Sequence, residues 1–355
     1  DDARRNEWNE KAREMAGRGL RVLALADRES ESPDEEPYRD LRLLGLIGLL
    51  DPPRDNVREA LAACARAGIR VIMVTGDQPE TALAIARELD LAGADDEAVT
   101  GTDLGDVETL SGEERQRLLE RRVFARVSPE QKLELLEVFQ QAGHQVAMTG
   151  DGVNDTPALQ KADIGIAMGK RGTDAAKESS DMVLLDDAFA DIVAAVEQGR
   201  VIFSNIRRAV FFVLCTNLSE VAAIGVASVL DWPLPLRPLQ ILYLNVLTDV
   251  LPALALSTGR GRPEEAMQRR PRDARESILT TAHWWTMAGW SALLSGCVLG
   301  ALLMADRLTG AATPAAVTTS FLTLGFAKLW FVFNLRTATS TLWHNDVVRN
   351  PWIWA

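Results

Sequence analysis

The stretch Met148-Thr149-Gly150-Asp151-Gly152-Val153-Asn154-Asp155 decides how the chain is interpreted. An apolar run that ends at Met148 leads into a loop with two glycines and two carboxylates, and a helix-compatible segment follows. This order is typical of a parallel-sheet strand that ends in an active-site loop, because glycine lets the backbone turn tightly there. Asp151 and Asp155 can both face a point just beyond the sheet, where oxygen ligands suit Mg²⁺ and a bound phosphate. A simple turn followed by helix-capping residues would also explain the stretch taken alone.

Composition divides the 355 residues into two dissimilar halves. Charged residues are dense up to about Arg208, and beyond it long apolar runs alternate with short polar loops. The net charge of −12 therefore belongs to the first half and argues against a nucleic-acid partner. The three cysteines are scattered, which implies neither a disulfide framework nor a thiolate metal site. The chain lacks an initiator Met and a signal peptide and stops within an aromatic run, so we expect a piece of a longer protein.

Residues 1–40 are too few to form a domain alone. They contain a charged helical stretch at 6–16, a short strand at 20–26 and an acidic, proline-containing loop at 29–37. We interpret them as the C-terminal end of a domain whose body lies upstream.

Residues 41–198 alternate predicted strands and helices. Strands are expected at 43–50, at 69–74, around Val146, at 164–168 and at 182–185. Helices are expected at 57–67, at 79–89 and after Ser128, which has the residue type and position of an N-cap. Apolar strands between amphipathic helices predict an α/β, Rossmann-like domain with a parallel sheet covered on both faces.

The second half contains four apolar segments close to the ~20 residues that span a bilayer. They lie at 209–230, 239–256, 284–304 and 317–335, and another begins at 351. Six arginines lie between Gly259 and Glu276, and others flank the same side, whereas the opposite loops carry only Arg237 and Arg307. By the positive-inside rule the soluble domain is cytosolic. We expect an α-helical transmembrane bundle at 209–355 in a lipid bilayer, joined by a stalk helix at 199–208; buried core helices are the alternative.

Three predicted elements of the α/β domain carry polar side chains at the edge where strand ends converge. They are Thr75, Gly76 and Asp77 after one strand, Lys132 on a helix, and Asp151 to Asp155. Together they supply a hydroxyl, a cation and carboxylates, which phosphoryl transfer with Mg²⁺ requires. Taken singly, Thr75 suits a cap and Lys132 a surface position. A nucleophile is missing, because no DKTGT-like strand end is present.

The membrane half has its own polar set. Asn217 and Glu220 share one face of the first span. The second span carries three polar residues just before Pro252, where a kink releases backbone carbonyls: Asn245, Thr248 and Asp249. Carboxylates at membrane depth mark an ion path, and this set would bind Ca²⁺ or a monovalent cation. A hydrogen-bond network between helices would explain the Asn and Thr residues but not both acids.

Several of these stretches resemble signatures of the P-type ATPases. MTGDGVNDTPAL at 148–159 closely matches their hinge motif, and three others resemble the P2 cation pumps: 50–54, 74–77 and 124–129. TNLSEV at 216–221 and LNVLTDVLPALAL at 244–256 are similar to the fifth and sixth membrane helices of calcium pumps. The resemblance runs along essentially the whole chain. It implies a HAD-type phosphorylation domain at 41–198, preceded by the end of a nucleotide-binding domain.

The resemblance also implies roles for single residues. Asp151 would hold the catalytic Mg²⁺, while Asn154 and Asp155 order the loop around it. Thr75, Gly76 and Lys132 would hold the phosphoryl group, Asp77 would lie beside the ATP, and Arg21 would touch the nucleotide. The transported cation, expected to be Ca²⁺, would be bound by a set of five residues: Asn217, Glu220, Asn245, Thr248 and Asp249.

Lys328 in the fourth span departs from this pattern. Counted back from Asn334, it falls where two-site reticulum calcium pumps carry an acid. Its ammonium could snorkel toward Arg336 at the cytosolic end. Otherwise it would pair with Glu220 or Asp249 and replace one bound cation, which predicts one Ca²⁺ per cycle.

Other parts of the pump pattern are absent: the phosphorylated aspartate, most of the nucleotide-binding domain, the actuator domain and the first four membrane helices. The expected function is therefore the C-terminal portion of an ATP-driven pump that exports Ca²⁺ through a cell membrane, inactive without its N-terminal half. The alternatives are a pump for Na⁺, K⁺ or another cation, and a non-catalytic remnant that still folds. A soluble phosphatase-like domain anchored by helices predicts an internal nucleophile and no membrane acids, and the sequence contradicts both.

Overall fold

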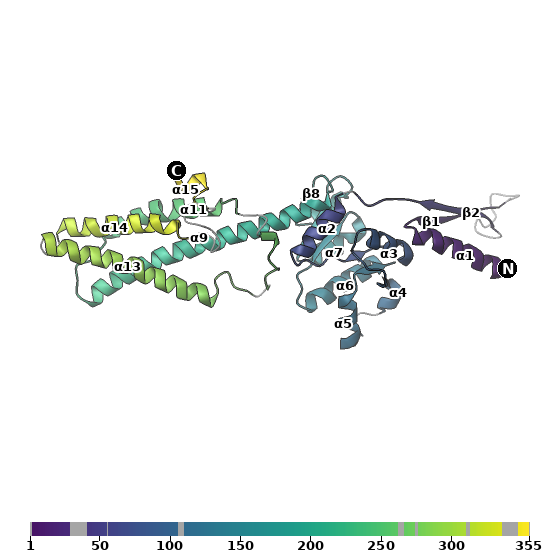
Figure 1. The fold of residues 1–355 in the computed structure, drawn as a ribbon, viewed down its shortest axis with the longest axis horizontal. Helices are drawn as coiled ribbons and strands as arrows, with labels where there is room; N and C mark the ends of the chain where they lie inside the picture. Colours follow the sequence, from purple (N-terminus) through teal and green to yellow (C-terminus); the bar gives the residue numbers. More distant parts are fainter. Residues whose placement is uncertain are drawn as a thin grey trace. The chain divides into compact units, whose positions relative to one another are not determined.

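The computed structural model describes residues 2–28, 41–54, 56–105, 110–261, 266–273, 276–309, 313–335 and 347–354. The acidic loop predicted at 29–37 and the flanking Arg336 lie outside these ranges. The chain separates into two compact units, at 1–194 and 195–355 (Figure 1).

The first unit begins with helix α1 (Asp2–Gly17) and an antiparallel hairpin of β1 (Arg21–Asp27) and β2 (Arg42–Leu49). The pair is closed by Arg42, which donates to both carboxylate oxygens of Asp27 at 3.0 and 2.8 Å. The strand predicted at 43–50 is thus present, but its assignment to the parallel sheet is wrong. Its apolar pattern fits either neighbour, and hydrogen bonding to β1 decides the outcome.

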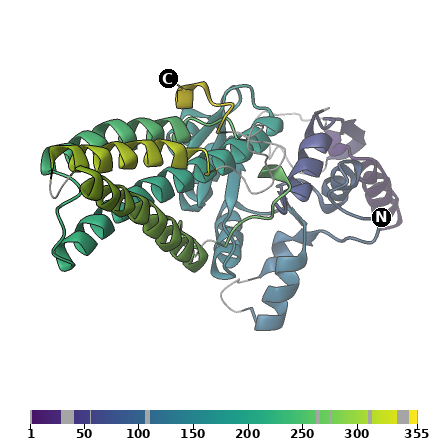
Figure 2. The same cartoon turned by 60° about the vertical axis from the view of Figure 1, so that its left-hand side comes forward.

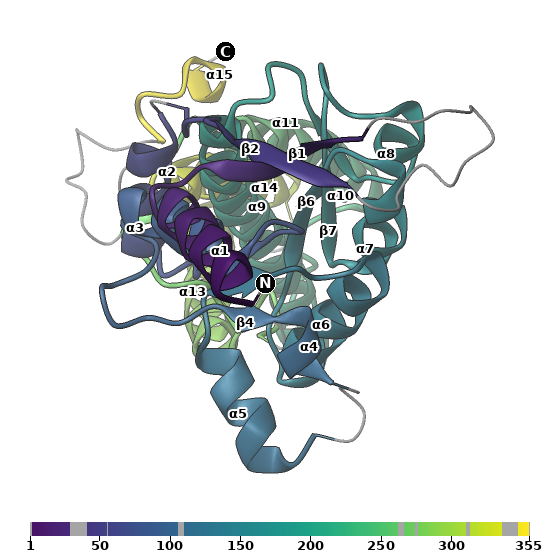
Figure 3. The same ribbon diagram turned by 90° about the vertical axis from the view of Figure 1, so that its right-hand side faces the viewer.

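Two three-stranded parallel sheets follow, in the orders β3-β5-β4 and β6-β7-β8. The first contains β3 (Met73–Val74), β4 (Val99–Thr100) and β5 (Val123–Ala125). The second contains β6 (Ala147–Gly150), β7 (Ile164–Met168) and β8 (Met182–Leu184). In Figure 3, β6 and β7 lie side by side, in agreement with their pairing from Ala147–Ile164 to Gly150–Ala167. The predicted parallel strands are confirmed in direction, although β3 is much shorter than 69–74.

Helices pack around these sheets. They are α2 (Val57–Arg66), α3 (Pro79–Glu88), α4 (Gly101–Leu104), α5 (Gly112–Glu120), α6 (Pro129–Gln141), α7 (Thr156–Lys161) and α8 (Asp174–Glu178). The main core joins α5 and α6 to β5 through Leu119, Leu135 and Phe124. The N-cap predicted at Ser128 is confirmed: its hydroxyl accepts from the Gln131 amide at 3.3 Å, and the Gln131 side chain accepts from the Ser128 amide at 3.1 Å.

The second unit is helical and begins within the long helix α9 (Phe189–Val229). The next span is built from α10 (Pro238–Leu244), a π-helical turn (Asn245–Val250) and α11 (Leu251–Ser257). Then come α13 (Thr281–Thr309), α14 (Pro314–Val332) and the short α15 (Pro351–Trp354). Four helices of the described chain are long and apolar enough to cross a membrane: 189–229, 238–257, 281–308 and 314–332. Each contains one of the four predicted apolar segments, except for the last residues of two of them.

Hydroxyl groups hold two of these helices together. Ser291 and Ser295, one turn apart on α13, donate to the carbonyls of Cys215 and Ser219 on α9 at 3.0 and 2.8 Å. Small side chains at this position let the two backbones approach closely. α13 and α14 run alongside each other (Figure 2, green to yellow). The bundle thereby fixes the face of α9 that carries Glu220.

Candidate functional site

The loop after β6 depends on the close packing of Gly150 against Asp155. A Cβ atom on Gly150 would lie 2.6 Å from the Cβ of Asp155, a distance that no side chain tolerates. Asp155 closes a short turn (Val153–Asp155) at the entrance to α7 and is buried. The glycine is therefore required because the carboxylate folds back under the strand end.

The two carboxylates of this loop have different surroundings. Asp155 accepts from Lys132 Nζ at 2.7 Å and from the Asp151 amide at 3.4 Å. Asp151 is exposed, and its carbonyl accepts from the Thr173 amide at 2.9 Å, which fixes the backbone and leaves its carboxylate without a hydrogen-bond partner among the described residues. An exposed carboxylate on a fixed backbone fits a Mg²⁺ ligand. Asn154, also exposed, lies between the two.

Thr75, Gly76 and Asp77 form a second turn directly after β3. The Thr75 hydroxyl donates to Asp77 at 3.1 Å and accepts from its amide at 3.1 Å. The Thr75 amide donates to Phe124 O at 2.9 Å, so β5 holds the turn in place. Apart from its chain neighbours, no described residue lies within 4 Å of the position of a Gly76 Cβ, so the space beside this exposed glycine is open.

These two groups are not joined to each other. In the described part of the chain, no hydrogen bond connects Thr75 or Asp77 to Asp151 or Lys132. Lys132, expected at the phosphoryl group, is instead held by Asp155. Arg21 lies exposed at the start of β1 in the hairpin. The proposed roles of these residues remain predictions.

In the helical unit, Lys328 joins the two membrane acids. Its Nζ lies 2.6 Å from Glu220 Oε1 and 2.9 and 3.1 Å from the two carboxylate oxygens of Asp249. Lys328 is 0% exposed, and both acids are 4% exposed. The predicted pairing is confirmed, and the snorkelling interpretation is wrong because the ammonium points into the bundle.

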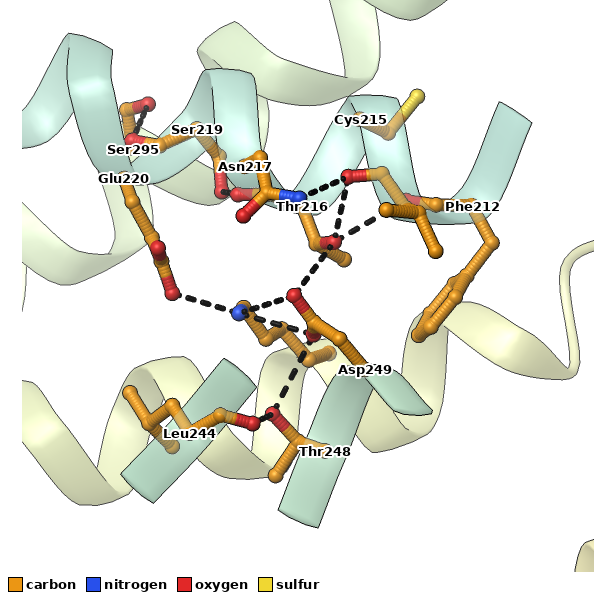
Figure 4. A network of polar contacts seen from close by, with 12 residues as sticks. Phe212, Cys215, Thr216, Asn217, Ser219, Glu220, Leu244, Thr248, Asp249 and Ser295 are labelled. Carbon is orange, nitrogen blue, oxygen red and sulfur yellow. Dashed lines mark hydrogen bonds and ion pairs between the residues drawn. The ribbon is translucent and has the colours of Figure 1, made fainter. Parts of the chain in front are cut away.

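Neutral polar groups complete the cluster (Figure 4). Thr216 donates to Asp249 Oδ2 at 3.2 Å, and Thr248 lies 3.4 Å from Asp249 Oδ1. In the amide orientation that satisfies both of its atoms, Asn245 donates to both oxygens of Glu220 at 3.3 Å. Asn217 donates to Val213 O at 2.9 Å and makes no hydrogen bond to the two acids.

The sequence pattern missed Thr216 and the π-helical turn. Thr216 is four residues before Glu220 and therefore on the same helical face, a spacing that would have identified it. The turn Asn245–Val250 includes Thr248 and Asp249. An extra residue in one turn, common at functional sites, rotates the side chains that follow it. The predicted kink at Pro252 thus comes with a wider turn immediately before it.

With all three ionised, the cluster of Lys328, Glu220 and Asp249 carries two negative charges and one positive charge. A buried charge is costly unless it is paired, so the surplus negative charge favours uptake of a cation or a proton. Thr216 and Thr248 add hydroxyl oxygens around it, while Asn245 faces Glu220 with its amide nitrogen. The cluster has the chemistry of a cation site in which the ammonium group of Lys328 already supplies one positive charge.

Comparisons with known proteins agree with both halves. Residues 3–163 match the haloacid dehalogenase-like hydrolase family model, a second such model matches 132–196, and residues 233–355 match the family model described as cation transporting ATPase, C-terminus. A calcium-transporting ATPase of Bacillus subtilis is 42% identical over 94% of this chain and 38% of its own length. Human calcium-transporting ATPase type 2C member 2 is 38% identical over 95% of the chain and 34% of its own length. A P-type sodium-transporting ATPase of Toxoplasma gondii is 44% identical over 82% of the chain and 24% of its own length.

The fold and these matches together show a haloacid dehalogenase-like domain followed by the C-terminal helices of a cation transporting ATPase. The chain belongs to the P-type cation-transporting ATPase family, and it is part of a multi-pass membrane protein. It spans less than two fifths of the length of the three relatives described.

Proposed function

We propose that the intact protein is an ATP-driven pump that exports Ca²⁺ from the cytosol across the cell membrane. This chain would supply part of its phosphorylation site and part of its cation path. The observation that carries the proposal is the buried Glu220–Lys328–Asp249 cluster inside helices that can span a bilayer. A purely structural helix bundle has no use for two buried carboxylates with one counter-charge, because such burial costs stability.

At the phosphorylation site, Asp151 would hold Mg²⁺, which neutralises charge on the phosphoryl group when bound. Thr75 and Gly76 would position that group with a hydroxyl and a backbone amide. Lys132 would leave Asp155 or extend from it to reach a phosphoryl oxygen, while Asn154 and Asp155 order the loop. Asp77 and, from the hairpin, Arg21 would lie beside ATP.

The nucleophilic aspartate would come from a segment outside this chain. β3 and β6 are edge strands, each with a hydrogen-bonded neighbour on one side only within the described residues. Both are followed directly by proposed site residues, Thr75 and Asp151. A further parallel strand beside them would end at the same edge of the sheet. This topology supports a phosphorylated residue delivered from the missing part of the pump.

In the membrane, Glu220 and Asp249 with the oxygens of Asn217, Asn245 and Thr248 would bind the transported Ca²⁺. Lys328 would occupy the place of a second ion, so that one Ca²⁺ moves in each cycle. When the site empties, a proton would replace the cation on a carboxylate, which gives proton countertransport. The unbroken α9, which contains both the stalk 199–208 and Glu220, would carry the movement from one site to the other.

The test is the ATPase activity of the intact protein titrated with Ca²⁺, Na⁺, K⁺ and Mn²⁺. Activation by micromolar Ca²⁺ supports the proposal, and activation by a monovalent ion alone contradicts it. Equilibrium binding of radioactive Ca²⁺ gives the stoichiometry. We expect one Ca²⁺ in the wild type and more in Lys328→Glu; two in both would refute the role of Lys328.

A pump for Na⁺ or another monovalent cation is the second candidate. Two observations favour it: the single surplus negative charge of the cluster, and the similarity to a sodium-transporting ATPase. The same titration separates the two candidates.

A further inference from the structure

Two arginines share one aromatic ring where α9 meets the loop that follows α11. The guanidinium carbon of Arg272 lies 3.2 Å from the ring centroid of Phe203, and that of Arg207 lies 5.0 Å from it. Glu276 of the same loop accepts from Arg207 Nη2 at 3.1 Å. The cluster Phe203–Arg207–Arg272–Glu276 thus contains two positive charges and one negative charge.

The loop is firmly attached to α9 at this point. Arg200 donates to the carbonyls of Ala266 and Arg269 at 2.9 and 2.7 Å. Asn205 donates to Gly259 O at 2.5 Å. These contacts bring Arg272 close to Phe203. The attachment of the loop does not itself require the positive charge of Arg272.

The cluster has binding capacity that the described chain does not use. The Nε atom of Arg207 is buried and has no hydrogen-bond acceptor among the described residues. The pKa of Arg272 is lowered by partial burial and by the positive charge of Arg207, only partly opposed by Glu276. An anion placed between the guanidinium groups would relieve this repulsion and supply the missing acceptor.

The position of the cluster suggests which anion. Arg207 and Arg208 immediately precede the apolar segment 209–230. After Glu276 the chain enters α13, which begins at Thr281 and has Trp284 and Trp285, 55% and 77% exposed, as its fourth and fifth residues. Tryptophans gather at the level of lipid headgroups, and arginines flank spans on the same side. A bilayer that covers the apolar segment would therefore place the cluster at the depth of its phosphodiester groups.

We propose that Arg207 and Arg272, supported by the ring of Phe203, bind the phosphate of an anionic phospholipid such as phosphatidylglycerol. Guanidinium groups bind phosphate oxygens in pairs and keep their charge at every accessible pH. The surplus positive charge selects against a zwitterionic lipid, because its ammonium group would face two arginines. The proposed site is separate from the cation path at Glu220 and Asp249.

The experiment uses the intact protein, purified in a non-ionic detergent and given equal amounts of phosphatidylglycerol and phosphatidylcholine. Native mass spectrometry counts the lipids retained. Wild type is expected to retain phosphatidylglycerol in preference, and Arg272→Gln and Arg207→Gln each to retain about fivefold less. Arg270→Gln is the matched control, since it removes one exposed arginine of the same loop that takes no part in the cluster. It should retain phosphatidylglycerol as the wild type does.

Three results would overturn the proposal. Equal loss in Arg270→Gln would show general electrostatic attraction without a site. Unchanged retention in the double variant Arg207→Gln/Arg272→Gln would show that the arginines serve only to attach the loop. Equal retention of both lipids by the wild type would remove the anionic preference. Arg272→Lys, which keeps the charge, should recover part of the retention and so separates lost binding from lost folding.

Discussion

Lys328 Nζ and Glu220 Oε1 are 2.6 Å apart in a part of the bundle where the lysine has no exposed surface. Asp249 Oδ1 lies 2.9 Å from the same Lys328 Nζ, so the lysine pairs with both acids. Lys328→Met leaves two neighbouring carboxylates without a counter-charge. We expect a loss of about 3–5 kcal/mol in the free energy of unfolding when no cation is present, because one partner of a buried ion pair is removed.

Calcium should restore much of that loss if the cluster is part of the cation site. The midpoint of thermal unfolding of the intact protein, measured with a chelator and with saturating Ca²⁺, gives the comparison. The Ca²⁺-dependent increase should be larger in Lys328→Met than in wild type. In Lys328→Met/Glu220→Gln, which has one acid fewer, the increase should return toward the wild-type value. An identical increase in all three proteins would place Ca²⁺ elsewhere.

Thr216 contributes to the same cluster through its hydroxyl, which is 3.2 Å from Asp249 Oδ2. Thr216→Val keeps the shape of the side chain and removes this hydrogen bond to a charged group, which contributes about 1.5–3 kcal/mol. We expect the cation concentration that gives half-maximal ATPase activity to rise at least tenfold. Thr319→Val is the control, because that hydroxyl is exposed and, among the described residues, donates only to Ala315 O. A Thr216→Val protein with wild-type cation affinity would exclude Thr216 from the site.

Local patterns predicted most elements of the chain but not the pairing of β2. The strand 164–168 is confirmed at both ends, and the helix after Ser128 begins where its capping residue predicts. Both depend on residues close in sequence. The partner of β2 is instead selected by hydrogen bonds to β1, which lies earlier in the chain. The apolar run that predicts β2 carries no information about these hydrogen bonds.

The candidate sites show the same division. That Lys328 pairs with the two acids follows from their burial and opposite charge, and the sequence contains both clues. The π-helical turn before Pro252 depends on how α10 and α11 pack in the bundle, which no local spacing reveals. The different surroundings of Asp151 and Asp155 depend on Gly150, whose missing Cβ makes room for Asp155.

Gly150→Ala tests that dependence. The new methyl carbon would lie 2.6 Å from the Asp155 Cβ, so the loop has to move and Lys132 loses its partner. We expect a destabilisation of about 1–3 kcal/mol from overpacking and loss of phosphoenzyme formation. Gly152→Ala is the matched control: its Cβ would meet nothing closer than 3.9 Å, at a negative φ of −110°. The amount of phosphoenzyme that the intact protein forms from radioactive ATP is measured for both variants. Equal amounts in Gly150→Ala and Gly152→Ala would contradict the role of Gly150.

Asp187 gives the soluble unit a defined dependence on pH. Its carboxylate accepts from the amides of Lys170 and Arg171 at 2.9 and 3.0 Å, and Arg54 donates to its carbonyl. Burial alone would raise the pKa of Asp187, but these amides, that of Gly169 and the charge of Arg54 outweigh it and hold the pKa below its usual range. A carboxylate with a lowered pKa in the folded state stabilises that state above its unfolded pKa, about 3.9, and the stabilisation is lost as the pH falls through the folded pKa.

Asp187→Asn should therefore lower the thermal midpoint of this unit at pH 7 and flatten its decrease below about pH 4, where the wild type loses the carboxylate. Asp186→Asn is the control one residue away. Asp186 pairs with Lys170 Nζ at 2.9 Å, but both side chains are mostly exposed, and such surface pairs contribute little. We expect its pH profile to follow the wild type. If Asp186→Asn and Asp187→Asn flatten the profile equally, the acid sensitivity comes from general surface charge, and the amides that surround Asp187 do not cause it.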